Sequence, residues 1–290
     1  MTLNNCGVCA AFLLIWIFAV LSPDIIYFVL ILLAAGVVAG LLAGLFGVGG
    51  GAVLVPVFFQ AFGAWGVDPS IVMHVSVGTS LAIIVPTSIR SFLTHKKHGA
   101  VDFDVLKKWV IAVPFGVFIA SFVAAYASGE ALRLIFACIA ILIAFRMLFN
   151  RPEWRLAGDL PTGLGRSAVG VVIGLLSALM GIGGGVLNNT FMTLFNRPMH
   201  QAVATSSGVG VLISIPGLIG YIWAGWGQAA LPPFSTGFIN WPSVLLIIPV
   251  TLFLAPIGAR LAHKMDKRQL EIGFGIFLII VAVRFFISLV

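Results

Sequence analysis

The chain has 290 residues, of which only 9% are charged and 61% are hydrophobic. Soluble proteins carry about 25% charged residues, and one soluble core could not bury so many long apolar runs. The composition therefore excludes an ordinary soluble domain and predicts an all-α polytopic membrane protein surrounded by lipid. The net charge of +7 reports orientation in the bilayer, because basic residues gather beside cytoplasmic span ends. We expect no binding of nucleic acid.

Residues 1–24 are predicted to form an extra N-terminal helix outside the repeated part of the chain. The run from Cys6 to Leu21 is short and uncharged, and it has neither a basic flank nor a small-residue cleavage site. We therefore expect a retained span and not a signal peptide. Cys6 and Cys9 form a C-x-x-C motif without a second ligand pair, so we expect no metal and no cofactor.

Residues 25–149 are predicted to form a first membrane repeat. An apolar run from Ile25 to Phe62 is interrupted by Gly47-Val48-Gly49-Gly50-Gly51. As one helix this run would be about 57 Å long, against about 30 Å of hydrocarbon. We therefore predict a broken-helix hairpin that leaves and returns on one side of the membrane. Three crossings follow it, at about Ser70–Leu93, Leu106–Ala127 and Leu132–Phe149.

Residues 150–165 form a polar linker, predicted to be cytoplasmic, and residues 166–290 follow the plan of the first repeat. The second glycine break is Gly181-Ile182-Gly183-Gly184-Gly185. The predicted helices of this half are Ser167–Met180, Val186–Phe195, Met199–Trp223, Pro242–His263 and Gln269–Leu289.

The two halves share a motif, H-x-x-V-[GA]-T-S, which begins at His74 and again at His200. An internal repeat with helix breaks at equivalent places is typical of secondary transporters. Because a hairpin plus three crossings is an odd number of crossings, the two repeats are predicted to be inverted with respect to the membrane.

The basic residues agree with this topology. It places the loops His95–Lys108, Arg151–Arg166 and His263–Arg268 in the cytoplasm, and the uncharged loop Gly225–Asn240 outside. The N-terminus is then cytoplasmic and the C-terminus periplasmic or extracellular. If each broken segment crossed the membrane once, the basic loop His263–Arg268 would lie outside, which the charge pattern disfavours.

The glycine breaks are the candidate substrate site. A helix that begins in mid-membrane presents free N–H groups and the positive end of its dipole, which favours an anion. The predicted substrate-binding residues are Gly49, Gly50, Gly51, Thr79, Ser80, Gly183, Gly184, Gly185, Asn188, Asn189, Thr205, Ser206 and Ser207. The alternative is structural, because small and hydroxyl residues also line packed transmembrane helices and amides also bond helix to helix.

Three further residues are candidates for gating or proton relay, namely His74, His200 and Arg90. The histidines stand at equivalent helix starts on opposite sides of the membrane in the predicted topology. Their structural alternatives are interfacial hydrogen bonds for the histidines and snorkelling for the arginine.

All nine acidic residues fall in predicted loops or at span ends. A cation carrier needs an embedded carboxylate, so the spans favour a small anion. The chain also lacks H-E-x-x-H and G-x-S-x-G motifs, and we do not expect an enzyme. An anion channel of the same architecture remains an alternative.

The segment from Gly40 to Gly51 reads G-x-x-x-G-L-x-G-x-G-G-G and is followed by Pro56, and Val77–Leu81 reads V-G-T-S-L. These motifs resemble the TauE/SafE family of sulfite exporters and toluene sulfonate uptake permeases. The resemblance implies a two-repeat carrier, usually in a prokaryotic inner membrane and often an exporter, for sulfite or organosulfonates such as sulfoacetate. The second copy departs from the motif, with Ala178 for Gly44 and Thr190 for Pro56. The oligomeric state is left open.

Overall fold

The computed structural model describes residues 23–46, 51–149, 159–262 and 267–289, and these are almost entirely helical. The predicted N-terminal helix, including Cys6 and Cys9, lies outside the described residues except for its last two positions. The helices of the first half are α2 (Pro23–Phe46), α3 (Gly51–Ala64), α4 (Val72–Lys97), α5 (Phe103–Tyr126) and α6 (Gly129–Leu148). Those of the second half are α7 (Leu164–Leu179), α8 (Gly185–Leu194), α9 (Met199–Ala224), α10 (Trp241–Ala262) and α11 (Lys267–Ile287).

Helices α5 and α6 begin at capping side chains. Asp102 precedes α5 and accepts hydrogen bonds from the amides of Asp104 and Val105. Ser128 precedes α6 and accepts one from the amide of Ala131. These caps satisfy amides that have no partner within the helix, so short connections can join long helices.

Five helices within the described ranges are long and apolar enough to cross a membrane, namely α4, α5, α6, α9 and the Trp241–Gly258 part of α10. Large apolar side chains stay exposed on their outer faces, for example Ile111 at 78% and Leu142 at 70% of their surface. Such faces suit lipid contact. The chain is therefore a multi-pass membrane protein, as its composition predicts.

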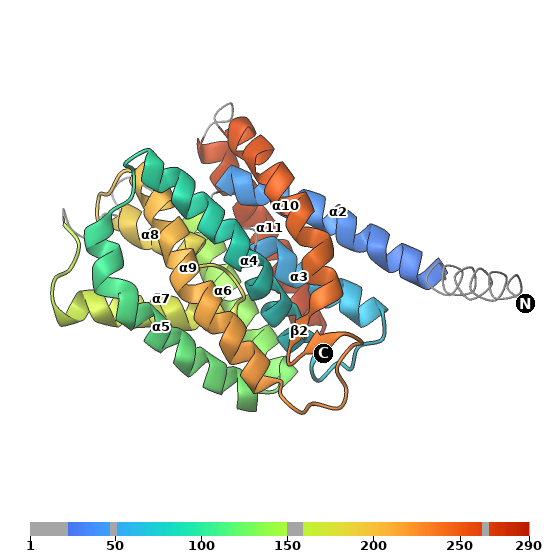
Figure 1. The fold of residues 1–290 in the computed structure, drawn as a ribbon. Helices are drawn as coiled ribbons and strands as arrows, with labels where there is room; N and C mark the ends of the chain where they lie inside the picture. Colours follow the sequence, from blue (N-terminus) through green and yellow to red (C-terminus); the bar gives the residue numbers. More distant parts are fainter. Residues whose placement is uncertain (1–22, 47–50, 150–158, 263–266, 290) are drawn as a thin grey trace, which may run out of the picture.

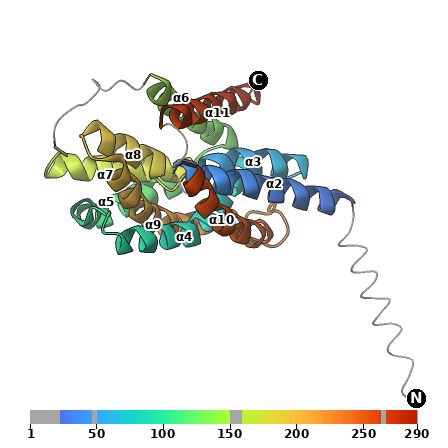
Figure 2. The same cartoon turned by 90° about the horizontal axis from the view of Figure 1, so that it is seen from above.

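Helices α4 and α9 lie side by side through the middle of the molecule (Figure 1). They run antiparallel, because Gly217 of α9 faces Leu81 while Gly210 faces Ser88, further along α4. Helices α6 and α11 also form an antiparallel pair, seen from above in Figure 2. The start of α6 meets the end of α11, where the Arg133 guanidinium donates to the Ser288 carbonyl oxygen at 2.8 Å.

Two further large packing contacts are equivalent in the repeat, and each joins one half of the chain to the other. Helix α2 packs against α10, and α7 packs against α5. Both contacts are parallel and depend on glycines: Gly36 and Gly40 of α2 face α10, and Gly170 and Gly174 of α7 face α5. Glycine lets the backbones of packed membrane helices approach closely.

Arg166, Arg197 and Arg268 make ion pairs or hydrogen bonds at one end of the molecule, whereas Arg133 is bonded at the other. Arg166 pairs with Asp104 at 2.7 Å, and Arg197 pairs with Asp159 at 3.7 Å. Arg268 donates to the last carbonyl groups of α6 at the same end. The opposite end holds the start of α4, the turn before α6 and a small hairpin of β1 (Ser235–Thr236) and β2 (Ile239–Asn240).

Candidate functional site

The two glycine segments meet in the interior. Gly51, the first residue of α3, packs so closely against Gly181 that a Cβ on Gly51 would overlap the Gly181 carbonyl oxygen. The same Cβ would lie 3.0 Å from the Cα of Ile182. Gly49 and Gly50 lie outside the described residues. The break predicted in each half therefore brings the two halves into backbone contact at Gly51 and Gly181.

The second break takes conformations that favour glycine. Gly181 has a φ of 64° and Gly184 a φ of 73°, both in the left-handed region. Gly183 faces Ile84 of α4, while Gly184 faces Ile213 of α9. Helix α8 starts at Gly185, directly after this turn. Its N-terminus is therefore enclosed by protein.

Asn188 and Asn189 form a hydrogen-bonded network with Ser206 of α9. Asn188 Nδ2 donates to Ser206 Oγ at 2.6 Å, and Ser206 Oγ donates to Asn189 Oδ1 at 2.6 Å. All three side chains are buried. Asn188 Oδ1 has no hydrogen-bond partner in the described part of the chain. The structure thus brings three predicted site residues together, and one polar group of each takes part in joining α8 to α9.

The first half lacks this network. Counted from the first helical glycine, Gly51 or Gly185, the positions of Asn188 and Asn189 correspond to Leu54 and Val55. Both are buried apolar residues. The two halves therefore offer different chemistry around their glycine breaks.

Thr79 and Thr205, which are equivalent in the repeat, bind loop backbone. Thr79 Oγ1 accepts a hydrogen bond from the amide of Asn240 at 3.1 Å, and Thr205 Oγ1 accepts one from the amide of Asp102 at 3.0 Å. Asn240 precedes α10 and Asp102 precedes α5, and each residue also accepts from the first turn of its helix. Each threonine therefore ties its long central helix to the start of a neighbouring helix.

The remaining two predicted hydroxyls also have backbone partners. Ser80 Oγ donates to the Gly181 carbonyl oxygen at 2.9 Å, which links α4 to the second glycine break. Ser207 Oγ donates to the Ala204 carbonyl oxygen within its own helix. Ser80 thus lies at the break, and the bond of Ser207 is local to α9.

Ser177 of α7 is a polar residue at the break that the sequence did not single out. Its side chain is fully buried, and its Oγ has no hydrogen-bond partner within the described ranges. A buried serine in a membrane helix usually donates to a carbonyl one turn earlier, as Ser121 does to Val117. No sequence pattern distinguishes these two serines, so only the tertiary structure identifies Ser177.

The candidate gating residues lie in different environments. His74 is buried, donates from Nε2 to the Ala127 carbonyl oxygen at 3.2 Å, and packs on Phe238 with ring centres 4.8 Å apart. His200 and Arg90 are exposed. The structure does not bring these three residues together, and their roles in gating stay predictions.

The hairpin of β1 and β2 covers the start of α4. Phe238, Ile239 and Asn240 are buried, and the Phe238 carbonyl oxygen packs against Gly78. The sequence predicts an interfacial loop over Gly225–Asn240, and its last residues instead enter the protein beside His74.

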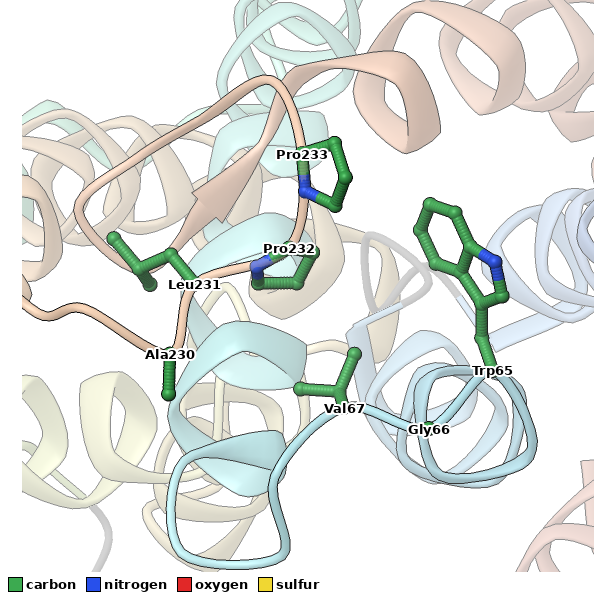
Figure 3. Close-up of a pocket in the computed structure, with 7 residues that line it drawn as sticks. All are labelled: Trp65, Gly66, Val67, Ala230, Leu231, Pro232 and Pro233. Atoms are coloured by element: carbon green, nitrogen blue, oxygen red, sulfur yellow. The ribbon is translucent and has the colours of Figure 1, made fainter.

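An open cavity of about 270 Å³ lies between the α3–α4 turn and the loop before β1. Figure 3 shows its lining residues, which are Trp65, Gly66, Val67, Ala230, Leu231, Pro232 and Pro233. These seven residues carry no charged group. The cavity adjoins the end of α3, whereas Gly51 begins that helix. It is therefore separate from the glycine contact.

Comparison with known proteins identifies the family of the chain. Residues 31–285 match the family model described as Sulfite exporter TauE/SafE. A probable membrane transporter protein of Haemophilus influenzae is 34% identical over 261 residues, which cover 90% of this chain and 99% of the relative. A probable membrane transporter protein of Methanocaldococcus jannaschii is 27% identical over 243 residues, covering 83% and 89%. The Bacillus subtilis protein YunE, also named a probable membrane transporter protein, is 28% identical over 270 residues, covering 87% and 94%. No solved structure matches the chain.

Proposed function

The chain belongs to the TauE/SafE sulfite exporter family of membrane transporters, and on that premise we propose that it exports small sulfur-containing anions. The proposed substrates are sulfite and organosulfonates such as sulfoacetate. The proposed mechanism is alternating access, in which one midplane site opens to each side of the membrane in turn.

The proposed framework for this mechanism is two inverted repeats, residues 25–149 and 166–290, with the midplane site between them. Two structural observations support this division. The equivalent helices α4 and α9 run antiparallel, as do the equivalent helices α6 and α11. The contact of α2 with α10 also has its counterpart in the contact of α7 with α5. An axis in the membrane plane would relate both sets of contacts.

The observation that carries the proposal is the contact of Gly51 with Gly181 beside the buried start of α8. A helix N-terminus inside the protein favours a bound anion through its free amides and its dipole. Among the described residues, the buried polar side chains include neither Asp nor Glu. A site of amides and hydroxyls without a carboxylate suits an anion better than a cation.

The proposed orientation follows from charge. The end of the molecule with Arg166, Arg197 and Arg268 would face the cytoplasm of a prokaryotic inner membrane. The inside-negative potential would then assist export by about 2.3 kcal/mol per charge for each 100 mV. No coupling ion would be needed.

Transport by proteoliposomes tests the proposal. We expect efflux of sulfite or sulfoacetate that saturates and that accelerates when an inside-negative potential is imposed. Unlabelled substrate on the opposite side should also accelerate exchange of labelled substrate. Potential-driven flux without saturation or exchange acceleration would instead indicate an anion channel, and absence of flux for every sulfur anion would refute the proposed function.

A further inference from the structure

The first turn of α8 begins inside the protein with donors that no side chain satisfies. Gly184 precedes the helix in a left-handed conformation, and no side chain caps the helix. Bonding within the helix starts at Asn188, whose amide donates to the Gly184 carbonyl oxygen at 2.9 Å. The preceding amides of α8 have no intrahelical partner, and the helix dipole places about half a positive charge at this N-terminus.

Ser177 provides an independent observation at the same place. Its fully buried Oγ lies 3.7 Å from the position that a Cβ on Gly184 would take. The hydroxyl is therefore beside the turn from which α8 starts, and it has no partner within the described part of the chain. Because a buried unpaired hydroxyl destabilises a fold, a bound acceptor would explain its presence.

The described surroundings of this turn supply no full positive charge. The side chains that face Gly183 and Gly184 include Ile84, Val209 and Ile213. The buried guanidinium groups of Arg133 and Arg166 are bonded at the two ends of the molecule. Asn188 Oδ1, in the first turn of α8, has no hydrogen-bond partner in the described residues either, and as an acceptor it adds no positive charge. The turn therefore has donors for one anion and no cation to balance a second negative charge.

We propose that this turn binds one singly charged oxyanion head group and discriminates against doubly charged oxyanions. The donors are the first amides of α8 and the Ser177 hydroxyl. The partial charge of the helix offsets part of one negative charge, whereas a second charge would be desolvated without compensation. This inference rests on the proposed function and specifies the charge of the group that the site accepts: sulfite would bind as hydrogensulfite, and sulfoacetate would bind through its singly charged sulfonate.

Thermal unfolding of the full-length protein in detergent tests the charge preference. The probes are methanesulfonate, which carries one charge, and sulfate, which carries two, at equal ionic strength. A ligand that binds only the native state raises the unfolding temperature. We expect a concentration-dependent rise with methanesulfonate and none with sulfate. An equal or larger rise with sulfate would overturn the proposal.

Two serine variants test the assigned position. Ser177→Ala removes the unpaired hydroxyl, and Ser121→Ala removes a buried hydroxyl that donates to Val117 within α5. Without ligand, Ser177→Ala should unfold at the same or a higher temperature, because it removes an unsatisfied group. Its Kd for methanesulfonate should be about tenfold weaker, the effect of losing one charge-assisted hydrogen bond. Ser121→Ala should keep the wild-type Kd, and a wild-type Kd in Ser177→Ala would refute the assignment.

Counterflow of methanesulfonate in proteoliposomes separates this inference from the function on which it rests. Exchange by the wild type that is unchanged in Ser177→Ala would refute this site and leave the transport function standing. Absence of both exchange and stabilisation with every sulfur anion would refute the transport function itself.

Discussion

The backbone amide of Asn240 donates a hydrogen bond to Thr79 Oγ1 at 3.1 Å, although 161 positions separate the two residues. Thr79 is buried in the central helix α4, and Asn240 immediately precedes α10. The repeat contains the same relationship once more, between Thr205 and the amide of Asp102. Both threonines stand in the shared H-x-x-V-[GA]-T-S motif. In both halves the threonine hydroxyl of that motif therefore accepts a hydrogen bond from a backbone amide.

Thr79→Val should destabilise the protein by about 1–3 kcal/mol, because the buried amide of Asn240 loses its acceptor. Thr79→Ser keeps the hydroxyl and should lose less than the valine variant. Chemical unfolding in detergent measures both effects. A stable Thr79→Val variant that no longer binds anions would show instead that the hydroxyl serves substrate and not the loop.

Ser206→Ala should lower the free energy of unfolding by more than the loss of a single neutral hydrogen bond would, because Asn188 Nδ2 and Asn189 Oδ1 both lose a buried partner. We expect about 2–4 kcal/mol of destabilisation. A double-mutant cycle with Asn189→Val should give a coupling energy of about 0.5–3 kcal/mol. Additive effects of the two substitutions would contradict the network.

Gly51→Ala should abolish transport or prevent folding, because the added Cβ would overlap the Gly181 carbonyl oxygen. Gly63, in the same helix, has open space around its Cβ position. Gly63→Ala is therefore the matched control and should stabilise the helix by about 0.5–1 kcal/mol. Expression, unfolding temperature and flux of the two variants test the contact, and a fully active Gly51→Ala protein would exclude it.

Asp68, which lies outside the membrane spans, should make the stability of the fold depend on pH. Hydrogen bonds from the Ser70 hydroxyl and amide lower the pKa of this exposed carboxyl below its ordinary value of 3.8. Because the folded pKa is lower than the unfolded one, the stabilisation is complete above the unfolded pKa and disappears as the pH falls through the folded pKa. NMR titration of the carboxyl should show a higher pKa in Ser70→Ala, and an unchanged pKa would contradict this origin.

The sequence predicts the helices well because the constraints of a bilayer are local. An apolar stretch must be about 20 residues long to cross, and glycine, proline and polar residues mark its ends. The predicted span Ser70–Leu93 is observed as Val72–Lys97, and Leu132–Phe149 as Gly129–Leu148. The family resemblance is confirmed by the match over residues 31–285.

The environment of single side chains was much harder to predict. His74 and His200 occupy equivalent positions in the motif, yet one is buried and the other exposed. The difference arises because the β1–β2 hairpin places Phe238 against His74. Ser177 and Ser121 look alike in sequence, but only Ser121 has a carbonyl partner in its own helix. The burial of His74 depends on a contact between distant segments, which local patterns do not encode.

The reciprocal packing of α2 on α10 and of α7 on α5 means that the two halves of the chain are interlocked. The first helix of each half packs against a helix of the other half, so neither half forms a complete helix bundle alone. Cleavage of the chain between α6 and α7 would leave two fragments, and each would need the other to complete its helix packing. The bodies that rock during a transport cycle would accordingly be mixed, each assembled from helices of both halves.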